Sequence, residues 1–301
     1  MALAACGRGT AERENASRPA IASDAPGASA STASGFAETG ASPAVLVPDE
    51  TAPDSVVAED QERDSEQQEF TLAWQDDFDT FDSSRWQLMT HSWDTNLAQF
   101  STGNARVENG VLSLLLTPEP SDLTKPLRGV EMRSLATLTY GKVESRLRFA
   151  RGSGVVSSLV LLYTPWPADD WNELDIEALG RYSDRVQFNA MVYTGAPTVP
   201  PARVSVTPTQ YPDLAPLPFD PSADFHVYAV EWTPVEVRFR VDGQVQHTWS
   251  TEIARMQLPQ NILLTIWASS SADWAGPLGQ DALPASADYD WIRVYQYQPA
   301  N

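Results

Sequence analysis

Three carboxylates alternate with apolar residues near the middle of the chain. Glu173, Asp175 and Glu177 are each followed by an apolar residue, in a segment that reads Trp-Asn-Glu-Leu-Asp-Ile-Glu-Ala from residue 171. On a β-strand, successive side chains point to opposite faces, so the three carboxylates would share one face. On a helix, the apolar residues would form no continuous stripe. We therefore expect a strand with one acidic face and one apolar face.

Such a row of acids is costly unless a reaction uses it. Neighbouring carboxyl groups would lie about 6–7 Å apart along the strand, so at least one pKa is expected to rise. Glycosidic bond hydrolysis needs one ionised carboxylate as nucleophile and one carboxylic acid to protonate the leaving oxygen. Trp171 beside the acids favours a sugar ligand, because sugars stack on indole rings. The alternatives are a calcium site and a solvated acidic strand face.

Composition excludes several other classes of function. The 301 residues contain 40 acids and 20 bases, which gives a formal net charge of −20. Such a field repels nucleic acid and anionic membrane surfaces. A single cysteine excludes an internal disulfide and a cysteine-based zinc site. No apolar run is long enough to span a bilayer. A polysaccharide is the expected partner, and we expect a monomer.

The chain divides into two segments of different composition. Residues 1–69 hold 13 acids, 4 bases and no tryptophan, which is typical of a disordered linker, whereas residues 70–301 are long enough for one folded domain. Near the start, residues 3–7 are similar to a bacterial lipobox in which Cys6 would be lipidated; the alternative is a chance match in an Ala-rich stretch. We expect export, as a periplasmic or cell-surface lipoprotein or as a secreted protein, with a lipid anchor as the only membrane contact.

The second segment predicts an all-β fold. Short β-rich runs recur between turn residues, and the dipeptides Asn109-Gly110 and Asp242-Gly243 predict tight hairpins. The nearly continuous apolar run at residues 155–163 predicts a strand buried on both faces. The other runs are residues 107–117, 141–149, 186–193, 226–232, 235–241, 245–249, 262–268 and 289–297. Many short strands at this spacing indicate a β-sandwich or jelly roll.

These segments resemble glycoside hydrolase family 16. The Glu-x-Asp-x-Glu signature stands at residues 173–177, and its surroundings are most similar to the lichenase branch, the endo-β-1,3-1,4-glucanases. The resemblance covers residues 74–297 and includes residues 76–86, 129–134, 186–189, 225–249 and 289–292. It implies a concanavalin A-like β-jelly roll of two antiparallel sheets with a concave substrate cleft.

The resemblance also implies a role for individual residues. Glu173 would be the nucleophile, Asp175 the assisting acid and Glu177 the general acid/base. The substrate-binding positions would be Glu131, Arg133, Tyr163, Trp171, Asn189, Trp267 and Trp274. Three of these positions have a structural alternative, since Glu131 and Arg133 would also form an ion pair and Trp267 would also suit the core.

No cofactor is expected for catalysis, but the resemblance implies a structural Ca²⁺ ion remote from the acids. Its ligands would be the Asp290 side chain and backbone carbonyl oxygens near Asp77 and Gly110, and oxygen ligands suit this ion. The alternative is that Asp290 caps a turn.

The expected function is retaining, endo-acting hydrolysis of a β-glucan by double displacement. A transglycosylase that remodels an envelope or extracellular β-glycan, and a non-catalytic carbohydrate-binding module, are the alternatives. Met191 stands where the lichenases carry an aromatic residue, and residues 195–218 form a Pro-rich insert. The resemblance therefore leaves the polysaccharide and its linkage open.

Overall fold

The computed structural model describes residues 69–164, 170–194 and 209–299. Cys6 and all of the predicted linker except Glu69 lie outside the described residues. In the described parts of the chain, no helix is long and apolar enough to cross a membrane.

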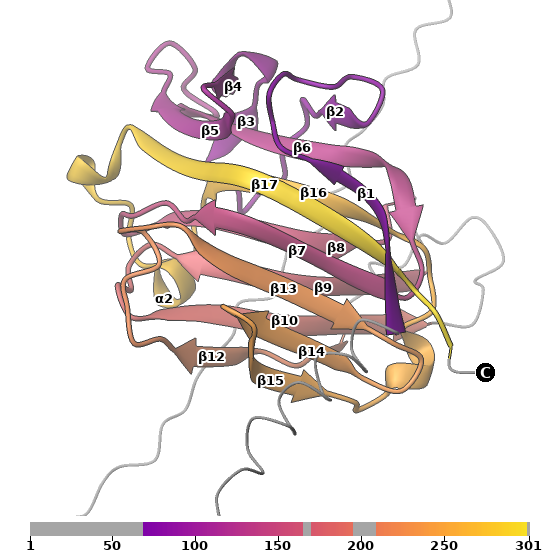
Figure 1. Cartoon of the computed structure of the whole chain (residues 1–301). Helices are drawn as coiled ribbons and strands as arrows, with labels where there is room; N and C mark the ends of the chain where they lie inside the picture. The colour runs from indigo at the N-terminus through magenta and orange to yellow at the C-terminus, as the bar shows by residue number, and fades with distance from the viewer. Residues whose placement is uncertain (1–68, 165–169, 195–208, 300–301) are drawn as a thin grey trace, which may run out of the picture.

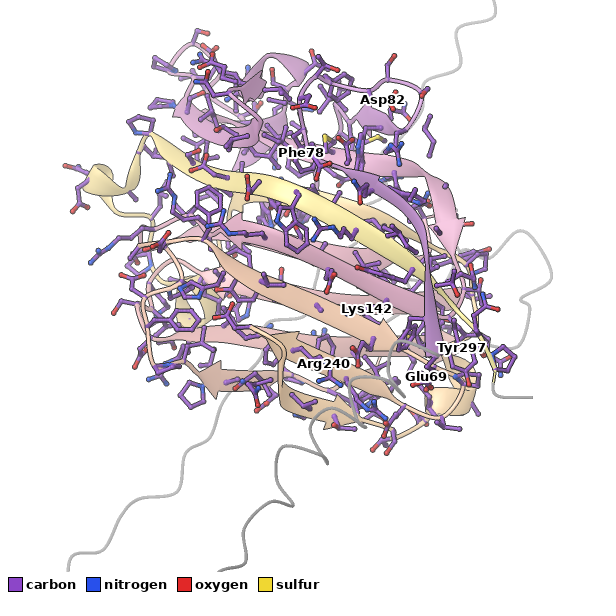
Figure 2. The ribbon with its side chains drawn as sticks, viewed as in Figure 1. Glu69, Phe78, Asp82, Lys142, Arg240 and Tyr297 are labelled. Carbon is purple, nitrogen blue, oxygen red and sulfur yellow. The ribbon has the colours of Figure 1, made fainter. Side chains whose placement is uncertain are left out.

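Sheet A is antiparallel and faces the viewer in Figure 1, where β1 and β17 are two of its strands. The strand order is β15–β14–β13–β7–β17; β5 and β1 pair with successive stretches of β17, and β4 pairs with β5. Its strands are β1 (Phe70–Asp76), β4 (Ala105–Glu108), β5 (Val111–Pro118), β7 (Gly141–Arg148), β13 (His226–Trp232), β14 (Val237–Val241), β15 (Gln244–Trp249) and β17 (Ala285–Tyr297). The labelled side chains of Lys142 on β7 and Arg240 on β14 mark this sheet in Figure 2.

Sheet B is the second antiparallel layer. Its order is β2–β6–β16–β8–β9–β10, with β11 and β12 on the outer edge of β10. Its strands are β2 (Trp86–Leu88), β6 (Leu127–Leu138), β8 (Val155–Leu162), β9 (Asp170–Leu179), β10 (Arg185–Thr194), β11 (Thr209–Gln210), β12 (Asp213–Pro216) and β16 (Gln260–Ala268). The short strand β3 (Ala98–Phe100) runs parallel to the start of β6. The helical pieces are η1 (Thr102–Asn104), η2 (Ile253–Arg255), α2 (Ala272–Ala275) and η3 (Gln280–Ala282).

The two sheets enclose one apolar core. The rings of Phe188 on β10 and Phe239 on β14 stack with centroids 5.0 Å apart, and Tyr289 of sheet A donates a hydrogen bond to the carbonyl oxygen of Ser158 in sheet B. Leu174 on β9 contributes to the same core and is completely buried. The predicted all-β jelly-roll sandwich is therefore confirmed.

Both predicted hairpins are present. Asn109 and Gly110 have φ values of 54° and 74°, and Asp242 and Gly243 have 48° and 78°. Two consecutive residues with positive φ are typical of the type I′ turn that joins twisted antiparallel strands. Strand β8 is buried on both faces over nearly its whole length, as the sequence predicted.

Two parts of sheet B contain strands that the sequence analysis did not predict. The long strand β6 was not among them, because charged residues and Gly129 interrupt its apolar pattern. A Cβ atom at Gly129 would lie 2.5 Å from the Ile266 carbonyl oxygen, so glycine allows β6 to approach β16. Within the Pro-rich insert, residues 195–208 lie outside the described residues, whereas β11 and β12 extend the edge of sheet B.

Candidate active site

Strand β9 carries the three acids on one face, as predicted. Leu174 and Ile176 between them are completely buried in the core, so the acids point to the opposite side of sheet B. Glu173, Asp175 and Glu177 pair with Leu162, Val160 and Ser158 on β8, and with Met191, Asn189 and Gln187 on β10. We call the side of sheet B that bears these side chains the acidic face.

The three carboxyl groups are shielded by the surrounding side chains. Glu173 is 4 % exposed, Asp175 0 % and Glu177 2 %. This burial argues against the solvated acidic strand face, because buried carboxylates are costly without specific partners. The arrangement instead matches a site in which specific side chains hold carboxyl groups in place, as Trp171 and Gln187 do here.

Trp171 holds the carboxylate of Glu173. Its indole Nε1 donates a hydrogen bond of 2.7 Å to Oε2 of Glu173, two residues away on the same face. A hydrogen bond to an ionised oxygen is short and strong, so it orients the carboxylate. Trp171 therefore acts on the predicted nucleophile directly, in addition to any contact of its ring with sugar.

Asn172 anchors the same part of β9 from the core side, a role that the sequence did not indicate. Its Oδ1 accepts hydrogen bonds from the backbone N–H groups of Gln257 and Leu258, each 2.9 Å long, and its Nδ2 donates to the carbonyl of Arg255 at 3.0 Å. These bonds tie the loop after η2 to the strand beside Glu173. A fully satisfied buried amide makes this part of the site rigid.

Glu177 has a partner on β10 that the sequence analysis did not single out. Gln187 lies directly opposite Glu177, with its Nε2 3.5 Å from Oε2 of the carboxylate. Its Oε1 accepts a 3.0 Å hydrogen bond from the indole Nε1 of Trp274, so the predicted Trp274 does lie beside the acids. On the other side of Glu177, the hydroxyl groups of Ser158 and Thr265 are 2.6 Å apart.

Glu131 and Arg133 lie on β6, which is three strands away from β9 on the acidic face. Arg133 Nε donates to Oε1 of Glu131 at 3.0 Å, so the predicted ion pair exists, and Glu131 is 4 % exposed. Glu131 is in register with Thr265, which continues the row through Ser158 to Glu177. The pair is therefore both an ion pair and part of this face.

His91 is a further neighbour of Glu131 that the sequence analysis missed. Its Nε2 lies 3.5 Å from Oε2 of Glu131. Burial lowers the pKa of His91, against the opposing effect of the Glu131 charge and with a smaller lowering effect from Arg133. This lowered pKa favours the neutral imidazole, which presents a hydrogen-bonding ring next to the carboxylate.

The aromatic residues form a second apolar cluster at one end of the acids. Trp267 is 3 % exposed and packs edge-on against Trp93, with centroids 5.0 Å apart, and obliquely against Trp274 at 5.8 Å. Trp267 therefore packs in an apolar cluster, which was the structural alternative to a sugar contact. Trp274 is only partly buried and is the outer member of the pair.

The two remaining predicted sugar contacts, Asn189 and Tyr163, lie differently relative to the row of acids. Asn189 is in register with Asp175, and its Oδ1 accepts a 3.1 Å hydrogen bond from the Tyr211 backbone, which fixes the amide orientation. Tyr163, the predicted aromatic contact, follows the end of β8. Leu162 is in register with Glu173, and the backbone N–H of Tyr163 donates to the carbonyl of Asn172. A shift of one residue exchanges the two faces of a strand, so the structure does not bring Tyr163 into this row.

The predicted metal ligands converge on one stretch of β17, remote from the acids. Asp76 pairs with Ile292 and Leu112 with Tyr289, which brings the chain near Asp77 and Gly110 to the neighbourhood of Asp290. Arg146 donates a 2.6 Å hydrogen bond to Oδ2 of Asp290, so the carboxylate already has a cationic partner. Among the described residues, no group of three or more His, Cys, Asp or Glu side chains forms a metal cluster.

The chain is similar in sequence and in structure to known β-glucanases. A β-glucanase of Fibrobacter succinogenes is 34 % identical over 181 residues, which are 58 % of this chain and 48 % of that protein. A β-glucanase of Paenibacillus polymyxa is 30 % identical over 223 residues, 71 % of this chain and 83 % of that protein. The Bacillus licheniformis β-glucanase structure matches with a TM-score of 0.64 at 27 % identity, over 75 % of this chain and 98 % of that chain.

The chain spans about half the length of the Fibrobacter relative and 62 % of a β-glucanase from Bacillus amyloliquefaciens. The model of the glycosyl hydrolases of family 16 matches residues 92–293, a segment that contains the acid row, Gln187 and Trp274. With this match and the geometry of β9, the chain belongs to the glycosyl hydrolases of family 16.

Proposed function

We propose that this chain hydrolyses β-1,3-1,4- or β-1,3-linked glucan internally, with retention of anomeric configuration. The observation that carries the proposal is the row of three buried carboxyl groups on β9, with the first oriented by Trp171. The β-glucanase relatives support the substrate class. A binding module would need no such row of acids.

The first step forms a covalent glycosyl-enzyme intermediate. A carboxylate oxygen of Glu173 attacks the anomeric carbon while the bond from that carbon to the leaving oxygen breaks. Glu177 gives its proton to the leaving oxygen, so the departing sugar leaves as a neutral alcohol. Asp175 lies between the two, and its burial next to both carboxyl groups suits a group that shares a proton with its neighbours.

The second step reverses the proton transfer. Glu177, now ionised, takes a proton from a water molecule, whose oxygen attacks the anomeric carbon and releases Glu173. Two inversions at one carbon give net retention. Capture by a sugar hydroxyl instead of water would make the product of a transglycosylase, so the nature of the acceptor is a measurable distinction.

The test is a product assay on the full chain with barley mixed-linkage glucan, laminarin and xyloglucan, each with and without an added oligosaccharide. We expect short oligosaccharides from mixed-linkage glucan or laminarin, with the β-anomer appearing first by NMR. An α-anomer as first product contradicts the retaining mechanism. Products longer than the added acceptor identify a transglycosylase, and intact polymers throughout contradict the enzyme assignment.

We also propose a weak structural calcium site at Asp290, completed by backbone carbonyl oxygens near Asp77 and Gly110. The oxygen donors suit calcium, but Arg146 already balances the only carboxylate, and affinity falls with ligand charge. We therefore expect a Kd of about 10⁻³ M. At 10 mM calcium this gives about 1.4 kcal/mol of stabilisation. The corresponding rise in Tm is about 3–6 °C.

Thermal melts with calcium and with a chelator measure this effect. Asp290→Asn should abolish the calcium-dependent rise. Asp288→Asn is the matched control, because it breaks a comparable 2.7 Å pair with Arg148 but leaves the proposed ligand in place. A calcium response that survives Asp290→Asn places the ion elsewhere.

A further inference from the structure

A chain of three side chains leads from the aromatic cluster to Glu177. Trp274 Nε1 lies 3.0 Å from Gln187 Oε1, and Gln187 Nε2 lies 3.5 Å from Glu177 Oε2. Gln187 is 5 % exposed, and it occupies the β10 position directly opposite Glu177. The last contact is long, as catalytic hydrogen bonds often are before substrate binds.

In the contacts that link Trp274, Gln187 and Glu177, the donor and acceptor groups of the side chains determine the direction of each hydrogen bond. An indole N–H group is only a donor, so it selects the carbonyl oxygen of Gln187 and turns the amide NH₂ group toward Glu177. An amide NH₂ group is also only a donor, so Oε2 of Glu177 must accept. The carbonyl oxygen of a protonated carboxyl group is a better acceptor than its hydroxyl oxygen, so donation by Gln187 favours the proton of Glu177 on the other oxygen, Oε1.

We propose that Trp274 and Gln187 are positioning residues that determine which oxygen of Glu177 carries the proton. The proposal rests on the proposed function, in which Glu177 is the general acid. It differs from the role of Trp274 as a sugar contact, because it uses the indole N–H group and not the ring.

The consequence concerns the proton that Glu177 delivers. Proton transfer to the leaving oxygen requires the O–H group to lie within hydrogen-bond reach of that oxygen. Glu177 is 2 % exposed and lies between β8 and β10, so its carboxyl group has little room to rotate. If the Gln187 amide were reversed, its carbonyl oxygen would accept the proton on Oε2, and the acid would be held in an unproductive form.

The experiment compares substrates that differ in their need for an acid. Trp274→Phe keeps an aromatic ring and removes the N–H group, and Gln187→Leu removes the donor to Glu177. On glucan we expect kcat of each variant to fall by about 10- to 100-fold, less than the loss of the acid itself would cause, with KM changed less than about twofold. On a dinitrophenyl β-glycoside, whose leaving group needs no protonation, the rate of forming the glycosyl-enzyme should change less than about threefold.

Further variants separate this role from a merely structural one. The double variant should lose no more than the worse single variant, because both residues act through one chain. Gln187→Glu keeps the side-chain size, cannot donate when ionised and should show the same selective loss. Trp249→Phe is the control, since the buried indole Nε1 of Trp249 has no hydrogen-bond partner among the described residues. It should keep wild-type kcat on both substrates.

Each contrary result identifies what is wrong. Wild-type kcat on glucan for Trp274→Phe, or equal losses on both substrates, overturns the positioning role alone. A rise in KM without a fall in kcat shows that Trp274 contacts sugar and also overturns it. A wild-type chain inactive on every glucan and glycoside overturns the proposed function, and this proposal with it.

Discussion

Glu173→Gln is expected to lower kcat on glucan by at least about 10⁴-fold while leaving the affinity for the polymer within a few-fold of the wild type. The amide has the size and shape of the carboxylate and still accepts the 2.7 Å hydrogen bond from Trp171, so the site should keep its geometry. It carries no negative charge, so it cannot form the glycosyl ester. Steady-state kinetics and titration calorimetry measure the two effects separately.

Glu108→Gln is the matched control for this change, because Glu108 is an exposed residue on β4 of the other sheet. It should retain full activity. A Glu173→Gln variant that retains more than about one tenth of wild-type kcat contradicts the nucleophile assignment. Loss of both binding and turnover, with a lowered Tm, would show that the carboxylate is needed for the fold.

Glu177→Ala is expected to have a substrate-dependent effect. On glucan, kcat should fall by about 10²- to 10⁴-fold, the usual contribution of a general acid. A dinitrophenyl glycoside should still form the glycosyl-enzyme, because its leaving group departs unprotonated. Hydrolysis of that intermediate then becomes slow, since no base activates water, and the intermediate should accumulate in a mass spectrum.

Azide provides a decisive control for the two roles. With Glu177→Ala, azide needs no base and should attack the intermediate to give the β-glycosyl azide, with rescue of turnover. With Glu173→Ala, azide should enter from the opposite side and give the α-glycosyl azide. Exchange of these two products between the variants would reverse the assignments of nucleophile and acid/base. Equal loss on all leaving groups for Glu177→Ala would contradict its acid role.

The acid row was predictable because it depends on one strand alone. Alternation along β9 directs Leu174 and Ile176 to the core and the acids to the other face, whatever the neighbouring strands are. The hairpins at Asn109-Gly110 and Asp242-Gly243 were equally local, since positive φ at two adjacent positions selects such residues. Lipidation of Cys6 and export of the chain remain predictions from the sequence.

The partners of the acids depend on registers between strands, which no local pattern specifies. Gln187 lies opposite Glu177 because the turn between β9 and β10 has one particular length, and a change of one residue would present the other face of β10. The same reasoning explains why Leu162 is in register with Glu173. Trp274 lies in α2 and is 87 residues from Gln187 in the chain, so only the tertiary structure brings the two side chains together.

The types and common face of the acids therefore follow from the amino-acid sequence, because side-chain alternation is a property of a single extended strand. Apart from the indole of Trp171 on the same strand, the oxygen or ring that each acid meets follows from the tertiary structure. His91 contacts Glu131, and Trp267 packs into a cluster, because loops and strands far apart in sequence enclose the same space. Strand order and register arise from burial of the whole core, and they carry no short-range signal.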